Sequence, residues 1–210
     1  MSNIQAVADI VIAGRAKQAP ALVQAALDAG ANAMDILNAM IEAMSVVGER
    51  FKNNEIFVPE MLVSAKTMKK GVEVLKPHLA ADAVGSRGKM VMGTVAGDLH
   101  DIGKNLVIMM IESAGFEVID LGVDVAHEKF VEAVRENPGV KIVGLSALLT
   151  TTMPALRDAV ALLNEQDFRK DIKVMVGGAP ITQAFADEIG ADAYTPDAAS
   201  AAEKAKELVS

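Results

Sequence analysis

The sequence predicts an α/β protein in which a four-helix bundle precedes a doubly wound, five-stranded parallel sheet. Three observations predict this fold class. From Ile4 to Leu79 the apolar residues recur at three- and four-residue spacing, which is the period of a helix. From Lys89 onward, short apolar runs alternate with helical stretches, as in parallel sheets that are covered on both faces. The segment AADAVGSRG, residues 80–88, separates the two patterns and has the composition of a linker.

The helices of the first part are bounded by residues that favour helix ends. Pro20 suits the first turn of the second helix, and Gly30 suits its end. The pair Asn53-Asn54 interrupts the third helix, and Pro59 opens the fourth. Four helices with short connections predict a bundle. The expected helices are residues 3–14, 19–29, 32–52 and 58–79.

The second part reads as five units of strand and helix. The expected strands are residues 89–96, 116–122, 141–146, 172–178 and 191–195. The expected helices are residues 102–114, 126–137, 153–166, 181–189 and 197–209. Five such units fit the flavodoxin-like, or Rossmann-like, strand order 2-1-3-4-5. We therefore expect a helical domain with its linker at 1–87 and an α/β domain at 88–210.

Composition excludes several classes of function. The chain of 210 residues has no cysteine, which rules out disulfides, thiolate metal sites and protein-ligated iron–sulfur clusters. A formal net charge of −8 argues against a nucleic-acid partner, because phosphate binding needs clustered Lys and Arg. Neither a signal peptide nor a run of about 20 apolar residues is present. We expect a cytoplasmic protein without a nucleic-acid or membrane partner.

The stretch GDLHDIGKN, Gly97 to Asn105, follows the first expected strand and contains one of only three histidines. His100 in this loop could be a solvated residue, a general base or a metal ligand. Asp98 is close enough to accept a hydrogen bond from the imidazole and so to fix its tautomer, as carboxylates do beside metal-ligating histidines. Gly103 lets the backbone approach a bulky group. The other two histidines, at positions 78 and 127, have no such neighbours and are expected to be structural.

A second polar loop follows the third expected strand, in the sequence LSALLTTTMP. Ser146 and Thr150 could offer hydroxyls there, whereas Thr151 or Thr152 could simply cap the next helix. In a doubly wound sheet the loops after strands 1 and 3 meet at the switch point, where ligands bind. Glycines 177 and 178 follow the fourth strand and fit either a plain turn or the close passage of a large ligand.

Taken together, these motifs resemble the fingerprint of cobalamin-binding domains. The three parts are Asp98-x-His100-x-x-Gly103, Ser146-x-Leu148 and the glycine pair. They are separated by 42 and 28 residues, as in methionine synthase, corrinoid methyltransferase proteins and adenosylcobalamin mutases. The segment VGERFKNNEIFVPEMLVSAKTMKKGVEVLKP, residues 47–77, resembles the helical cap of the methyl-carrying branch, which the mutases lack on their cobalamin domain.

The resemblance implies a cofactor, cobalamin or a related corrinoid, and a role for each motif residue. His100 is expected to be the metal ligand, in place of the corrinoid's own lower base, with Asp98 and Thr152 completing a relay behind it. Ser146 and Thr150 would bind the displaced nucleotide tail, and the two glycines would leave room for it. The full set of expected cofactor-binding residues is Gly97, Asp98, Leu99, His100, Asp101, Gly103, Ser146, Leu148, Thr150, Gly177, Gly178, Ala198 and the cap residues Phe51, Val58 and Met61.

The function implied by the resemblance is that of a corrinoid methyl carrier, the non-autonomous subunit of a methyltransferase system. Such a carrier cycles between Co(I) and methyl-Co(III). One methyltransferase, specific for the substrate, loads the methyl group, and a second passes it to coenzyme M or tetrahydrofolate. A reductive activase is a further expected partner. Two alternatives are a cobalamin-binding sensor or regulator and a flavodoxin-like signalling domain without a cofactor.

Overall fold

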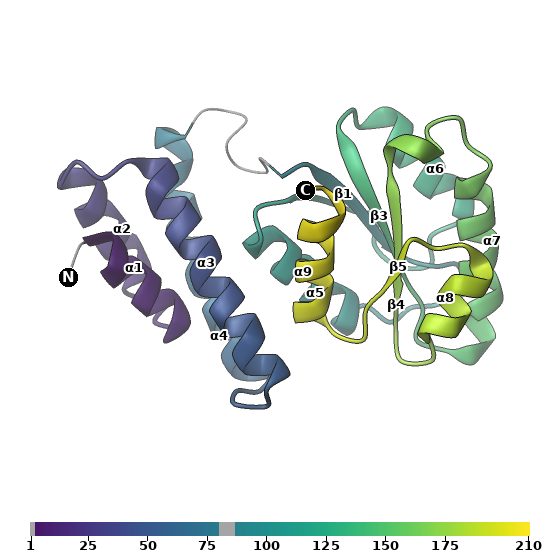
Figure 1. Cartoon of the computed structure of the whole chain (residues 1–210), viewed down its shortest axis with the longest axis horizontal. Coiled ribbons are helices and arrows are strands. Elements are labelled where there is room, and N and C mark those ends of the chain that lie inside the picture. Colours follow the sequence, from purple (N-terminus) through teal and green to yellow (C-terminus); the bar gives the residue numbers. More distant parts are fainter. Residues whose placement is uncertain (1–2, 80–86) are drawn as a thin grey trace. The chain divides into compact units, whose positions relative to one another are not determined.

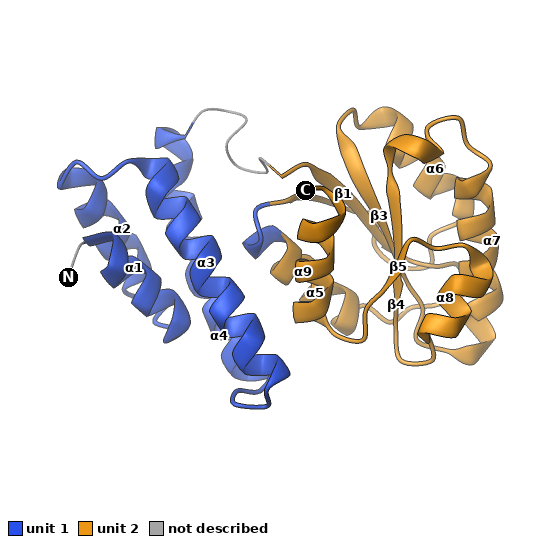
Figure 2. Ribbon diagram, in the orientation of Figure 1, with its two compact units in different colours: residues 1–86, 112–115 blue, residues 87–111, 116–210 orange. Residues whose placement is uncertain are grey.

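The computed structural model describes residues 3–79 and 87–210 (Figure 1). The chain divides into two compact units, residues 1–86 with 112–115 and residues 87–111 with 116–210 (Figure 2). Most of the expected linker, residues 80–86, lies outside the described residues. The first unit contains the helical bundle and the second contains the parallel sheet. The predicted fold class is therefore confirmed.

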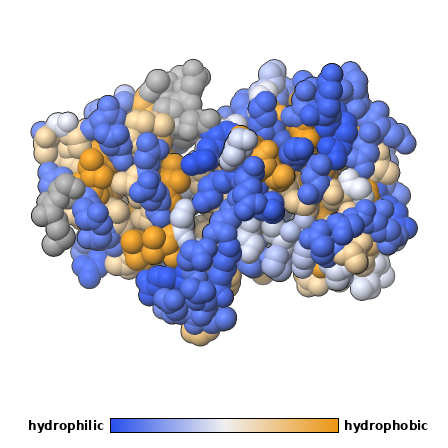
Figure 3. Space-filling model, viewed as in Figure 1, coloured by the Kyte–Doolittle hydropathy of each residue, from blue (hydrophilic) through white to orange (hydrophobic). Residues whose placement is uncertain are grey.

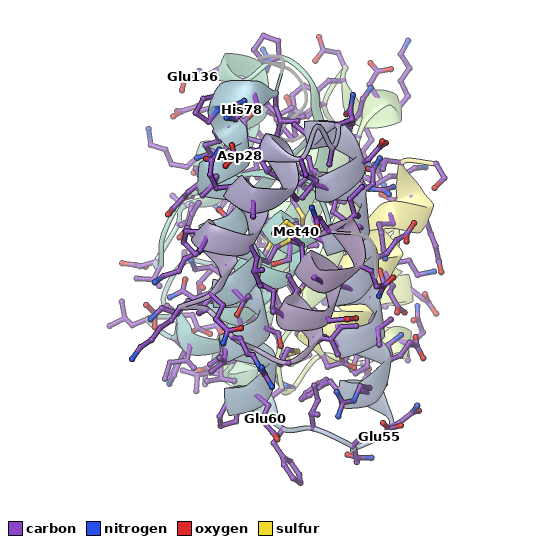
Figure 4. All side chains as sticks on the ribbon, turned by 90° about the vertical axis from the view of Figure 1, so that its left-hand side faces the viewer. Asp28, Met40, Glu55, Glu60, His78 and Glu136 are labelled. Carbon is purple, nitrogen blue, oxygen red and sulfur yellow. The ribbon has the colours of Figure 1, made fainter. Side chains whose placement is uncertain are left out.

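The bundle consists of α1 (Asn3–Ile12), α2 (Ala19–Asp28), α3 (Ala33–Lys52) and α4 (Val58–Leu75). Asn32 caps α3 by accepting a hydrogen bond from the Met34 N–H at 2.8 Å. At the start of α4, the Glu60 carboxylate accepts from the Phe57 N–H at 2.7 Å. Figure 4 shows Glu60 and His78 at the two ends of α4 and Met40 in the bundle interior. The fully buried Met40 lies over Gly71 of α4, where a Cβ atom would collide with its methyl group.

The fourth helix ends four residues earlier than expected. The spacing of apolar residues predicted a helix to residue 79, but α4 ends at Leu75 and a 3-10 turn, η1 (Lys76–His78), follows. Pro77 causes this change because it has no N–H with which to continue the α-helical hydrogen bonds. His78 is exposed, in agreement with its expected structural role.

The sheet contains β1 (Lys89–Thr94), β2 (Glu117–Asp120), β3 (Val140–Ser146), β4 (Lys173–Gly177) and β5 (Ala193–Tyr194), all parallel. Their order is β2-β1-β3-β4-β5, which confirms the predicted topology. The helices are α5 (Ile102–Ser113), α6 (His127–Glu136), α7 (Met153–Asn164), α8 (Gln183–Ile189) and α9 (Ala198–Leu208). Two 3-10 turns, η2 (Thr150–Thr152) and η3 (Arg169–Asp171), precede α7 and β4.

Helices cover both faces of the sheet. Figure 1 shows α5 and α9 on one face and α6, α7 and α8 on the other. The helices α6, α7 and α8 share a continuous apolar core with the strands, centred on fully buried side chains such as Phe130, Val143 and Leu156. The ring of Phe130 occupies the space where a Cβ atom on Gly93 of β1 would lie. The sheet is therefore a rigid support for the loops that leave its carboxyl edge.

The outer surface is mainly polar, in keeping with the net charge of −8. On the face drawn in Figure 3, hydrophilic residues surround smaller hydrophobic patches. None of the helices in residues 3–79 and 87–210 is both long enough and apolar enough to cross a bilayer.

Candidate functional site

The loops after β1, β3 and β4 begin side by side at the carboxyl edge of the sheet. Thr94 of β1 lies opposite Ser146 of β3, and Ser146 lies opposite Gly177 of β4. The backbone pairing continues one step beyond the strands, because the Val95 N–H donates to the Ser146 carbonyl at 3.0 Å. This register brings the first, second and third sequence motifs to one edge, as the predicted topology requires.

Asp98 joins the loop after β1 to the loop after β3. Its side chain is fully buried and accepts four hydrogen bonds. Oδ1 accepts from the His100 N–H at 3.0 Å and lies 2.9 Å from His100 Nδ1. Oδ2 accepts from the Leu148 N–H at 2.6 Å and from the Thr152 hydroxyl at 2.9 Å. The predicted group of Asp98, His100 and Thr152 is therefore assembled around one carboxylate.

The surroundings of Asp98 keep it ionised. Burial alone raises the pKa of a carboxyl group, but the hydrogen bonds from the N–H groups of Leu148 and His100, and from the side chains of His100 and Thr152, outweigh it. Together they lower the pKa of Asp98 to about 2. An ionised carboxylate only accepts hydrogen bonds, so the proton between Asp98 and His100 belongs to Nδ1.

This tautomer leaves the other imidazole nitrogen of His100 as a free electron-pair donor. Among the described residues, Nε2 has no hydrogen-bond partner, and the side chain is 52% exposed. An imidazole oriented through Nδ1 by a carboxylate is the usual arrangement of a metal-binding histidine. No group of three or more His, Cys, Asp or Glu side chains that could hold a metal is found within residues 3–79 and 87–210.

Exposed apolar side chains of the α/β unit come from the loop that contains His100 and from the loop that Asp98 joins to it. The exposed large hydrophobic residues of this unit are Leu99, Ile102, Leu148 and Leu149, all from the two loops that Asp98 joins or from the start of α5. Exposed apolar side chains gathered at one place mark a binding surface.

The glycines of the motifs differ in what they do. A Cβ atom on Gly103, in the first turn of α5, would have no atom within 4 Å, so the chain itself does not require glycine there. Gly178 has a φ of +131°, and a Cβ atom would overlap the carbonyl oxygen of Ala147. The positive φ and the close approach of Ala147 therefore require glycine at position 178, whereas no atom near position 103 requires one there. A Cβ atom on Gly177 would approach the Thr195 carbonyl at 3.4 Å.

The remaining candidates lie around this centre or in the bundle. The N–H of Gly97 donates to Asp124 Oδ1 at 2.7 Å, and Asp101 accepts from the Asn105 amide at 3.1 Å. Ser146 is half-buried at the end of β3, Thr150 is exposed in η2, and Ala198 is buried at the start of α9. The cap candidates belong to the other unit, where Val58 is exposed, Phe51 is half-buried and Met61 is completely buried.

Sequence reasoning missed several polar residues near the site, among them Lys104, Asp120 and Asp124. Lys104 is nearly fully buried, and its Nζ donates to Asp120 Oδ1 at 2.6 Å and to Asn105 Oδ1 at 3.0 Å. Its spacing from Ile108 and Ile111, both buried on α5, could have shown that it faces inward. Asp124 has a positive φ of 53°, which no pattern in the sequence indicates.

The comparisons with known proteins agree with this geometry. Two B12 binding domain models match the chain, one at residues 88–205 and one at residues 4–76. Dimethylamine corrinoid protein 2 of Methanosarcina mazei is 43% identical over 207 residues, which are 98% of this chain and 96% of the relative. A doubly wound domain in which the buried Asp98 orients the half-exposed His100 at the switch point has the layout of a ligand-binding α/β protein. The chain belongs to the B12-binding domain family.

Two solved structures match this chain over 99% of its length. A cobalamin-binding protein from Desulfitobacterium hafniense has a TM-score of 0.84 and 32% identity, covering 99% of this chain and 98% of its own. The methanol:cobalamin methyltransferase complex MtaBC from Methanosarcina barkeri has a TM-score of 0.84 and 30% identity, covering 99% of this chain and 79% of the matched one. The predicted family and the predicted cofactor, cobalamin or a related corrinoid, are confirmed.

Proposed function

We propose that this chain is the corrinoid-carrying subunit of a methyltransferase system and that His100 is its axial ligand to cobalt. The observation that carries the proposal is the Asp98-oriented imidazole, whose Nε2 has no partner among the described residues. When bound, the corrinoid supplies a cobalt centre that can accept and release a methyl group. The protein binds the ring, directs the imidazole and controls the proton on Nδ1.

The relay behind His100 is proposed to tune how strongly the imidazole donates to cobalt. Asp98 stays negative and holds the Nδ1 proton, which fixes the tautomer and the orientation of the ring. The Thr152 hydroxyl has one proton and two acceptors in reach, Asp98 Oδ2 and the Leu149 carbonyl, both at 2.9 Å. Rotation of this hydroxyl makes or breaks its hydrogen bond to Asp98, and this changes how strongly the carboxylate attracts the Nδ1 proton of His100. The relay can therefore adjust the ligand without moving the backbone.

The other motif residues are proposed to hold the rest of the cofactor. Ser146 and Thr150 would bind the nucleotide tail, with Gly177, Gly178 and Ala198 lining its path. We also propose that residues 1–87 form the cap, with Val58 and Phe51 covering the upper face of the corrin. The exposure of Val58, at 39%, supports this role, whereas Met61 would act from within the bundle core.

The names of the matched proteins suggest the partners that we propose for this chain. The matched relative is a dimethylamine corrinoid protein, and one matched structure is of a methanol:cobalamin methyltransferase complex. We propose that a substrate-specific methyltransferase loads this carrier with a methyl group and that a second one unloads it to coenzyme M or tetrahydrofolate. A reductive activase would return oxidised cobalt to Co(I).

The ligand assignment is tested by reconstituting the full chain with hydroxocobalamin and recording its absorption spectrum. His127→Ala is the matched control, because His127 is also a partly exposed histidine of the α/β unit. We expect the wild type and His127→Ala to share one spectrum and His100→Ala to differ. Failure of the wild type to retain cobalamin would overturn the whole proposal, and an unchanged spectrum in His100→Ala would overturn the ligand assignment.

The carrier function needs a second experiment. The Co(I) form is mixed with candidate methyl donors and their methyltransferases, and methylation of cobalt is followed by absorbance. Transfer from one of these donors is expected for a carrier. A protein that retains cobalamin through His100 but accepts no methyl group from any donor would instead match the sensor alternative.

A further inference from the structure

Thr94 is a buried hydroxyl that none of the roles above uses. It is the last residue of β1 and has no exposed surface. Its backbone is fixed on both sides, because its N–H donates to the Gly122 carbonyl and its carbonyl accepts from the Val125 N–H, both at 3.0 Å. Its hydroxyl donates to the carbonyl oxygen of His100 at 2.9 Å. A rigid strand end therefore contacts the backbone of the proposed cobalt ligand directly.

The other hydrogen bonds to His100 do not fix its position by themselves. The ring Nδ1 and the backbone N–H both lie within 3.0 Å of the same atom, Asp98 Oδ1. Two bonds that meet at one atom allow the residue to pivot about that atom. His100 also lies in a stretch without regular helix or strand, so no ladder of backbone bonds restrains it. The bond from Thr94 supplies a second, separate point of attachment.

We propose that Thr94 is a positioning residue for His100, whose hydroxyl restrains the backbone so that Nε2 occupies a narrow range of positions. This inference rests on the proposed role of His100 as the cobalt ligand. A ligand that is held in place before binding loses less conformational entropy when it coordinates the metal. Removing the hydroxyl should therefore weaken the cobalt–imidazole bond, although Thr94 contacts neither the cobalt nor Nε2 of His100.

The test compares Thr94→Val, which replaces the hydroxyl by a methyl group of similar size, with Thr94→Ser, which keeps the hydroxyl. Thr67→Val is the matched control, since Thr67 is equally buried and its hydroxyl donates to the Val63 carbonyl at 2.7 Å in the bundle. Each full-length protein is titrated with hydroxocobalamin and then reduced to Co(II). Each protein is produced with nitrogen-15-labelled histidine. In electron paramagnetic resonance a histidine nitrogen on cobalt then splits the signal into two lines, whereas nitrogen-14 of the cofactor's own base splits it into three. The nitrogen-ligated fraction is the fraction of cobalt that shows the two-line splitting.

For Thr94→Val we expect hydroxocobalamin to bind about fivefold more weakly, the factor that one neutral hydrogen bond typically contributes, with a smaller nitrogen-ligated fraction. Thr94→Ser should restore both values to within about twofold of the wild type. Thr67→Val should leave the nitrogen-ligated fraction unchanged. If Thr94→Val does not fold, Thr94→Ala, which introduces no new methyl contact at the hydroxyl position, takes its place in the comparison.

Three results would overturn the inference. Nitrogen ligation in the valine or alanine variant could equal that of the wild type. The serine variant could lose as much ligation as the valine variant, which would remove the hydroxyl from the explanation. Thr67→Val could lose as much as Thr94→Val, which would indicate a general loss of packing. A wild type without any axial nitrogen would instead contradict the proposed function of His100.

Discussion

The buried side chain of Asp98 accepts four hydrogen bonds, so its replacement should affect both the stability of the fold and the binding of the cofactor. In Asp98→Asn the amide can accept on one side only, so either the His100 donors or the Leu148 and Thr152 donors lose their acceptor. We expect the free energy of unfolding of the cofactor-free protein to fall by about 1–3 kcal/mol. Hydroxocobalamin should bind roughly 10–100-fold more weakly, as for other lost partners of metal ligands. Urea unfolding and a binding titration measure the two effects.

Gly103 should show opposite effects on stability and on binding. A Cβ atom there meets nothing within 4 Å, so Gly103→Ala should stabilise the cofactor-free protein by about 0.5–1 kcal/mol through its better helix propensity. The same methyl group should weaken hydroxocobalamin binding if the open space belongs to the cofactor. Gly178→Ala is the comparison, because its clash with Ala147 should destabilise the fold. Unchanged cobalamin affinity in Gly103→Ala would show that the space is not used.

Local spacing predicted the contacts of the site between residues that are close in the chain, and the resemblance to cobalamin-binding domains supplied Thr152, which lies 54 positions from Asp98. Asp98 and His100 are two positions apart, so their contact could be expected from the sequence. The bond from the Leu148 N–H to Asp98 spans 50 positions, and a backbone donor has no signature in a residue type. Thr94 was missed for a similar reason, because a threonine at a strand end is ordinary until its hydroxyl is seen beside His100.

At the scale of elements, the pair of Lys104 and Asp120 links the first turn of α5 to the end of β2. The Lys104 side chain is 1% exposed and the Asp120 side chain is 42% exposed. Asp120→Ala would leave a buried ammonium group without its carboxylate, and we expect a loss of about 2 kcal/mol. Lys104→Met removes the buried charge and leaves a carboxylate that water can reach, so its loss should be smaller. Urea unfolding of both variants tests this order, and a larger loss for Lys104→Met would contradict it.

The elements themselves were largely predictable, and the differences have local causes. The alternation of strands and helices indicated the order of the sheet, which depends on topology rather than on exact boundaries. The eighth helix was expected from residue 181 but begins at Gln183, because the Thr182 side chain caps it through the Phe185 N–H. The 3-10 turn at Thr150–Thr152 was not expected, and it places the Thr152 hydroxyl against Asp98.

At the scale of the whole molecule, we expect the cofactor to stabilise the folded chain. A ligand that binds only the native state adds about 2.7 kcal/mol to its stability when its concentration is 100 times the dissociation constant. Hydroxocobalamin should therefore raise the melting temperature of the wild type in a concentration-dependent way. His100→Ala should show a smaller rise at equal concentration, because it has lost the bond to cobalt. An equal rise in both proteins would indicate that the ring is held without the histidine.

The central claim is that a nitrogen of His100 binds cobalt, and isotope labelling tests it most directly. The protein is produced with nitrogen-15-labelled histidine, loaded with unlabelled cobalamin and reduced to Co(II). If His100 is the ligand, the label changes the nitrogen splitting of the electron paramagnetic resonance spectrum in the wild type and in His127→Ala. The splitting due to the labelled histidine disappears in His100→Ala. A splitting that the histidine label does not alter would show that the axial nitrogen comes from the cofactor's own base and would contradict the claim.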